Sequence, residues 1–144
     1  MRTNSFVSLL LLPLSLSLSI AHAGENQHSL YNRLGEKKAL VAVVDDFIGN
    51  VAADKRINSF FAKTDIPHLK KMLVEQLCAG TGGPCTYSGR DMKSTHAGLD
   101  IGGADFTALV EDLVTTMDKF KVPTAEKNEL LGILGPMKKD IVTQ

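Results

Sequence analysis

Helical periodicity is the feature of this 144-residue chain that most limits its fold. Apolar residues recur at three- and four-residue spacings, which place them on one face of a helix, in several separate segments. These segments are Glu36–Ala53, Ile66–Ala79, Gly103–Lys121 and a last one from Thr124 to about Ile141. Asp65 and Thr124 are expected to cap two of the helices, and Pro136 is expected to bend the last one. Nothing after residue 23 alternates as a strand does, so we expect an all-α fold.

Met1–Ala23 has the pattern of a secretory signal peptide. Arg2 provides a positive start, an apolar run over residues 6–20 follows, and the segment ends in Ala-His-Ala. The apolar run is shorter than the roughly 20 residues that span a membrane, and serines and a proline interrupt it. We expect a periplasmic or secreted protein whose mature form is a single domain, residues 24–144.

The expected mature chain is close to electrically neutral. Loss of Arg2 leaves fifteen basic side chains against sixteen acidic ones. A nucleic-acid-binding domain would need an excess of basic residues, so neither a nucleic acid nor a membrane is an expected partner. A chain of this length can form one hydrophobic core. We expect a monomer or a weak dimer.

The segment Gly80–Gly102 departs from the helical periodicity. Only one short turn, Arg90–His96, is expected to be helical. An irregular stretch of this length inside a small domain is usually functional or disordered, and the apolar residues spaced along this one argue against disorder. Met92 and His96 are four residues apart and would share one face of the turn. The segment is therefore expected to wrap around a ligand and to direct His96 toward it.

Several stretches of the sequence resemble, in the same order, the group 1 truncated hemoglobins. The family's opening is matched by "SLYNRLG" (29–35), although Glu36 replaces a glycine there. The stretch "VVDDFIGNVAADKRINSFFAKTD" (43–65) resembles the second helix and the corner after it, and "GGPCTYSGRDMKSTHAGL" (82–99) resembles the loop that leads to the iron-binding histidine. The stretch "VPTAEKNELLGILGPMKKDIV" (122–142) resembles the final helix. The resemblance implies a truncated globin fold, a two-over-two helical sandwich around a b-type haem.

This resemblance assigns His96 as the proximal ligand of haem iron. A neutral imidazole is a strong ligand for iron. The alternative is a histidine that caps the C-terminus of its own short helix. Arg90, Lys93 and Tyr87 are expected near the haem propionates. The full set of implied haem contacts is Phe47, Ile48, Phe61, Leu69, Met72, Leu73, Tyr87, Arg90, Met92, Lys93, Phe106 and Leu109, with Val110 beside them.

The distal side departs from the family's usual pattern. Many members carry a tyrosine after a phenylalanine on the second helix, where this chain has Phe47 and Ile48. The usual Gln or His donors of the third helix correspond to Leu69, Met72 and Leu73. Loss of a hydrogen bond of roughly 1.5–3 kcal/mol predicts oxygen retention about ten- to a hundredfold weaker. Carbon monoxide and nitric oxide are expected to be less affected.

Other side chains on the third helix leave alternatives open. Met72 stands where some relatives carry an iron-bound histidine, so it is either a sixth iron ligand or pliable core filler. Gln76 is either a donor that swings over the iron or a polar residue at the edge of the apolar stripe. His68 is either a distal group or a surface histidine. No role is expected for His28.

Cys78 and Cys85 are the only cysteines in the chain. In an exported protein this pair favours a disulfide over two free thiols, and the bridge would tie the third helix to the segment that presents His96. The chain lacks a Cys-x-x-Cys-His motif, so the haem is expected to be held without covalent bonds. An interpretation without haem would use both cysteines, Met72 and Met92 as soft ligands for cuprous copper.

The expected function is reversible binding of oxygen, carbon monoxide and nitric oxide at the iron of a haem protein, including oxygen transport. Turnover of nitric oxide or of peroxide would also need a reductant, which an electron-donor protein would supply. No catalytic side chain is expected besides the haem. The alternative is an electron-transfer haem protein in which Met72 occupies the sixth position.

Overall fold

A computed structural model describes residues 29–144, and over this range its regular elements are all helical. The elements are α1 (Leu30–Arg33), α2 (Glu36–Ala53), the 3-10 turn η2 (Asn58–Phe61), α3 (Ile66–Gly80), α4 (Met92–His96), α5 (Gly103–Lys119), α6 (Thr124–Leu134), the 3-10 turn η3 (Gly135–Met137) and α7 (Lys138–Ile141). The all-α prediction is confirmed. The predicted signal peptide and His28 lie outside the described residues. Within residues 29–144, no helix combines the length and the apolar content needed to cross a membrane.

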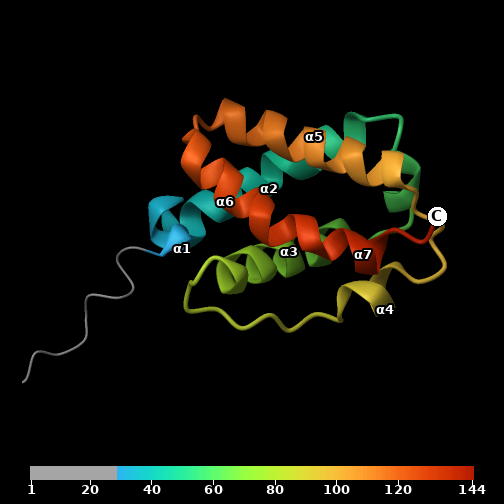
Figure 1. Cartoon of the computed structure of the whole chain (residues 1–144), viewed down its shortest axis with the longest axis horizontal. Helices are drawn as coiled ribbons and strands as arrows, with labels where there is room; N and C mark the ends of the chain where they lie inside the picture. The colour runs from blue at the N-terminus through green and yellow to red at the C-terminus, as the bar shows by residue number, and fades with distance from the viewer. Residues whose placement is uncertain (1–28) are drawn as a thin grey trace, which may run out of the picture.

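The long helices α2, α3, α5 and α6 pack around one core (Figure 1). α2 packs against both α3 and α5, and α1 packs against α2 and α6. α3 and α5 are joined through a long segment that contains only α4 as a regular element, and α4 packs against α7. The chain thus places the short helix α4 against its last helix, α7.

The contact between α2 and α5 is tightly closed. Met117 of α5 is 1% exposed. Thr116 is fully buried, and its Oγ1 accepts a hydrogen bond from Asn50 Nδ2 at 2.9 Å while donating one to Asp46 Oδ2 at 3.2 Å. Burying a hydroxyl without hydrogen-bond partners would destabilise the fold. Here the donor and the acceptor of the Thr116 hydroxyl each have a partner.

The structure corrects some predicted helix boundaries. Thr124 is not an N-cap, because the extended backbone of Pro123 (ψ of 152°) fills that position and Thr124 is already helical. α5 ends at Lys119 rather than Lys121, since Lys121 has a left-handed φ of 55°. Pro136 lies in η3, a 3-10 turn that interrupts the predicted last helix between α6 and α7.

The predicted cap of α3 is also confirmed, since the Asp65 side chain accepts from His68 N at 3.1 Å. The turn predicted from Arg90 begins two residues later, at Met92. Asp91 explains the later start, because its carboxylate accepts from Ser94 N at 2.8 Å and makes Asp91 the cap.

Candidate functional site

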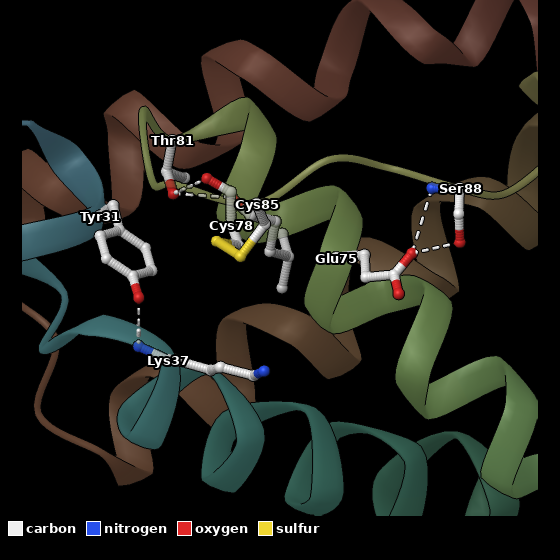
Figure 2. Close-up of a disulfide and its surroundings, with 8 residues drawn as sticks. Tyr31, Lys37, Glu75, Cys78, Thr81, Cys85 and Ser88 are labelled. Atoms are coloured by element: carbon white, nitrogen blue, oxygen red, sulfur yellow. Dashed lines mark hydrogen bonds between the residues drawn. A yellow bond between two sulfur atoms is a disulfide. The ribbon is translucent and has the colours of Figure 1, made fainter.

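The segment after α3 runs back alongside that helix until it reaches α4 (Figure 1). A disulfide between Cys78 of α3 and Cys85 holds its first part, with the two Cα atoms 5.7 Å apart. Figure 2 shows the bridge close to Tyr31 and Thr81. The predicted disulfide is confirmed. The copper interpretation, which needed both sulfurs as free ligands, is wrong.

Gly83 allows the segment to turn tightly over the end of α3. A Cβ atom at this position would lie 2.6 Å from Tyr31 Cδ2 and 2.7 Å from Cys78 Sγ. The Gly83 N–H donates to the Cys78 carbonyl oxygen at 2.7 Å. A larger residue would therefore push the backbone away from the disulfide, which explains why glycine occupies this position.

A polar contact holds the same segment further along. Oε2 of Glu75, on α3, accepts hydrogen bonds from Ser88 N at 3.1 Å and from Ser88 Oγ at 2.7 Å (Figure 2). These bonds hold the pKa of the Glu75 carboxyl below its ordinary value. α3 therefore fixes the returning segment both by a covalent bond and by a carboxylate.

His96 is the last residue of α4, and its Nδ1 lies 2.7 Å from the carbonyl oxygen of Met92. A carbonyl can only accept, so Nδ1 of the neutral ring carries the proton. Nε2 is then unprotonated and presents its lone pair, as a metal-binding imidazole must. The two interpretations of His96 are compatible, because one ring nitrogen caps α4 and the other stays available.

Gln76 connects α3 to the helix that carries His96. Its Nε2 donates to Met92 Sδ at 3.5 Å and to Met137 Sδ at 3.3 Å. α5 meets the same region through Phe106, whose ring centroid lies 5.8 Å from Lys138 Nζ of α7. The structure therefore links α3 to α4 and η3 through Gln76, and links α5 through Phe106 to α7, which packs against α4.

Most apolar residues predicted to contact haem remain partly exposed in this chain. Phe61, Leu69, Leu73 and Leu109 pack against the core without being buried. Met72, Met92, Phe106 and Val110 have similar intermediate exposure. A flat apolar group that carries iron would cover apolar side chains that keep exposed surface, and His96 presents Nε2 as a ligand, so these residues fit haem. The individual contacts stay predictions.

Phe47 and Ile48 differ from that set, since they are 8% and 6% exposed and belong to the buried core. The side chains of Ile48, Leu69 and Leu73 contain no hydrogen-bond donor. Met72 is half-buried on α3. His68 is exposed, which fits the surface alternative.

The polar residues predicted near the propionates lie before α4 or in its first turn. Arg90 and Lys93 are exposed. The Tyr87 hydroxyl donates to the Arg90 carbonyl oxygen at 2.8 Å, and burial raises the pKa of this tyrosine. The hydroxyl proton of Tyr87 is thus used within the segment, whereas both cationic side chains extend into solvent.

Comparison with known proteins decides the family. The model of the family "Bacterial-like globin" matches residues 29–143. A group 1 truncated hemoglobin of Tetrahymena pyriformis is 32% identical over 114 residues, which are 79% of this chain and 94% of the relative. Another, from Mycolicibacterium paratuberculosis, is 35% identical over 80% of this chain and 85% of the relative. The chain belongs to the group 1 truncated hemoglobins.

Solved structures of this family share the fold. The Fe(III) form of the Tetrahymena pyriformis truncated hemoglobin superposes with a TM-score of 0.77, at 32% identity, over 81% of this chain and 99% of that one. The 2/2 hemoglobin of Synechococcus sp. PCC 7002, in the cyanomet state with covalently attached haem, gives a TM-score of 0.76 at 30% identity over the same shares. The predicted truncated globin fold, two helix pairs in a sandwich, is confirmed.

Proposed function

We propose that this truncated hemoglobin holds a non-covalent haem b through Nε2 of His96 and reversibly binds oxygen, carbon monoxide and nitric oxide. Membership of the family supports a haem- and gas-binding globin. The hydrogen bond between His96 Nδ1 and the Met92 carbonyl carries the assignment of this residue, because it leaves Nε2 as the free ligand nitrogen. Haem supplies an iron with one open position for a diatomic gas.

The sequence supports a haem that is held without covalent bonds. The Synechococcus relative has its haem covalently attached. This chain has only two cysteines, no Cys-x-x-Cys-His motif, and its cysteines are joined to each other. Retention of haem would therefore depend on His96 and on the half-exposed apolar side chains of α3 and α5.

The apolar distal residues support a selectivity among gases. Ile48, Leu69 and Leu73 offer no N–H or O–H to a bound ligand. Oxygen gains most from such a donor, because charge accumulates on it when it binds iron. We therefore propose weak oxygen retention, about ten- to a hundredfold below a relative with one strong donor, and smaller losses for carbon monoxide and nitric oxide.

Turnover and location form a further part of the proposal. Oxidation of nitric oxide, or reduction of peroxide, would draw electrons from a separate electron-donor protein.

The disulfide supports export to the periplasm or beyond, since disulfides persist in oxidising compartments. A role in electron transfer would instead require Met72 Sδ to bind the iron, and Met72 lies half-buried on α3.

Absorption spectra of the purified protein test this proposal. The oxidised form, the dithionite-reduced form and the reduced form with carbon monoxide should be recorded. We expect a five-coordinate ferrous haem that binds carbon monoxide at once. A six-coordinate, low-spin ferrous spectrum that Met72→Leu converts to five-coordinate would move the assignment to electron transfer. A protein that takes up no haem would contradict the proposal.

A further inference from the structure

The strongest unassigned feature is a set of polar contacts between α3 and the helix of the proximal histidine. Gln76 Nε2 donates to two thioether sulfurs, Met92 Sδ at 3.5 Å and Met137 Sδ at 3.3 Å. The three residues come from α3, α4 and η3, and all three are half-buried. An amide has two N–H donors on one nitrogen, so both contacts can exist together.

The same three residues lead directly to His96. Met92 offers its sulfur to Gln76 and its backbone carbonyl to His96 Nδ1, at 2.7 Å. α4 has only five residues, fewer than an isolated helix needs for stability, so its orientation depends on contacts outside it. Of the side-chain hydrogen bonds within residues 29–144, those of Gln76 are the ones that join α4 to α3 and η3.

We propose that Gln76 is a positioning residue for the proximal histidine. By holding Met92 against α3 and η3, its amide fixes the rotation of α4 and with it the direction of the His96 Nε2 lone pair. Gln76 would then act on the histidine, through Met92, and would not hydrogen-bond the gas. This inference rests on the proposed haem ligation by His96.

Vibrational spectra distinguish the two places where Gln76 could act. The test compares wild type with Gln76→Leu, which lacks the N–H donors, and Gln76→Glu, whose carboxylate would face both sulfurs. We expect the iron–histidine stretching band of the ferrous protein to shift in both variants. The iron–carbon monoxide band should stay at its wild-type position. A shifted iron–carbon monoxide band with an unchanged iron–histidine band would overturn the proposal and place Gln76 over the gas.

Haem loss to an excess of a haem-free acceptor globin gives a second readout. Loss of such hydrogen bonds should make dissociation about three- to tenfold faster in Gln76→Leu, and faster still in Gln76→Glu. The matched control is Glu75→Gln, the neighbouring residue on the same helix, which weakens the contact to Ser88 but not the contact to α4. Whatever its rate of haem loss, the iron–histidine band of this control should not shift. An equal shift in Glu75→Gln would show general loosening of the segment and would contradict a specific role of Gln76.

A double-mutant cycle identifies the contact itself. Met137→Leu removes one acceptor and keeps an apolar side chain of similar size. If the contact matters, combining it with Gln76→Leu should accelerate haem loss by less than the product of the two single effects, because the second change removes nothing further of this bond. Strictly multiplicative effects would contradict the link.

A measurement on the haem-free chain keeps this inference separate from the proposed function. Gln76→Leu should speed hydrogen exchange of the α4 amides, including Thr95, whose N–H donates to the Asp91 carbonyl at 3.0 Å. Unchanged exchange there would overturn the positioning role even in a protein that binds no haem. If wild type takes up no haem but exchange responds, the proposed function fails and only the link between Gln76 and α4 stands.

Discussion

The contact between α2 and α5 and the region between α3 and α4 are built in different ways. In the first, Met117 is 1% exposed, and the hydroxyl of Thr116 has one partner for its donor and one for its acceptor. In the second, apolar side chains such as Leu69 and Leu73 keep exposed surface, and the amide of Gln76 meets thioether sulfurs rather than oxygens.

The difference separates the part of the chain that stabilises the fold from the part that would bind a ligand. Burial of apolar surface drives folding, so the closed contact stabilises the fold without a ligand. The half-exposed residues leave apolar surface that a bound group would cover. Because α4 is short, the disulfide, Glu75 and Gln76 hold the open region in shape.

The largest expected effect comes from the closed contact. Met117→Ala should lower the free energy of unfolding by about 2–5 kcal/mol, because it leaves a cavity where little surface is exposed. Denaturant titration measures the loss. The matched change in the open region is Met72→Ala. In the haem-free protein it should lower the free energy of unfolding clearly less than Met117→Ala does. In the haem-loaded protein it should speed haem loss. Equal losses of stability from both variants would show that the two regions do not differ as described.

Removal of the disulfide should have the next largest effect. Its closed loop is short, and the chain-entropy relation gives at most about 2.5 kcal/mol for a bridge over this separation. Cys85→Ala combined with Cys78→Ala should lower the midpoint of unfolding and also speed haem loss. Because Cys78 is fully buried, its replacement leaves a small cavity, so reduction of the unaltered chain with dithiothreitol is the control. If both the reduced protein and the substituted protein bind haem as stably as wild type, the disulfide does not contribute to haem binding.

A donor placed in the open region should strengthen oxygen binding by a similar free energy, about 1.5–3 kcal/mol. Leu69→Gln puts an amide at a partly exposed position of α3 and should slow oxygen dissociation about ten- to a hundredfold. Carbon monoxide dissociation should change little. Laser photolysis and stopped-flow mixing measure both rates, with Leu69→Met as the apolar control. Equal slowing in Gln and Met variants would argue for packing instead of a hydrogen bond.

The smallest effect concerns pH and the contact between Glu75 and Ser88. The pKa of Glu75 is lowered from its ordinary value of 4.5, chiefly by the hydrogen bond from the Ser88 hydroxyl. A lowered folded-state pKa means that the contact stabilises the protein fully above about 4.5 and is lost as the pH falls through the folded-state value. Wild type should therefore be more stable than Glu75→Gln at pH 7, and the difference should shrink below pH 4.5. A difference independent of pH would assign the effect to packing.

Periodicity is enough to predict the long helices, because each buries one continuous face. It does not predict α1 or η2, since four residues are too few to show a period. The prediction of Thr124 as a cap is wrong although its side chain suits that role, because the backbone of Pro123 decides the position.

For the site, the sequence motif predicts His96 as the iron ligand, and the two cysteines correctly predict their own bridge. The link from Gln76 to Met92 and Met137 has no sequence signal, because it joins residues 16 and 61 positions apart through side-chain packing. The hydrogen bond from His96 to Met92 can be predicted from the sequence, because a ring on a helix lies beside the carbonyl four residues earlier.

Ligation by His96 is tested most directly by chemical rescue of the haem site. His96→Gly should bind haem weakly and lose the iron–histidine band of the ferrous protein in resonance Raman spectra. Added imidazole should restore both binding and a band close to that of wild type, because it supplies the missing nitrogen to an otherwise intact site. If His96→Gly keeps the wild-type band without imidazole, another residue holds the iron and α4 does not carry the proximal ligand.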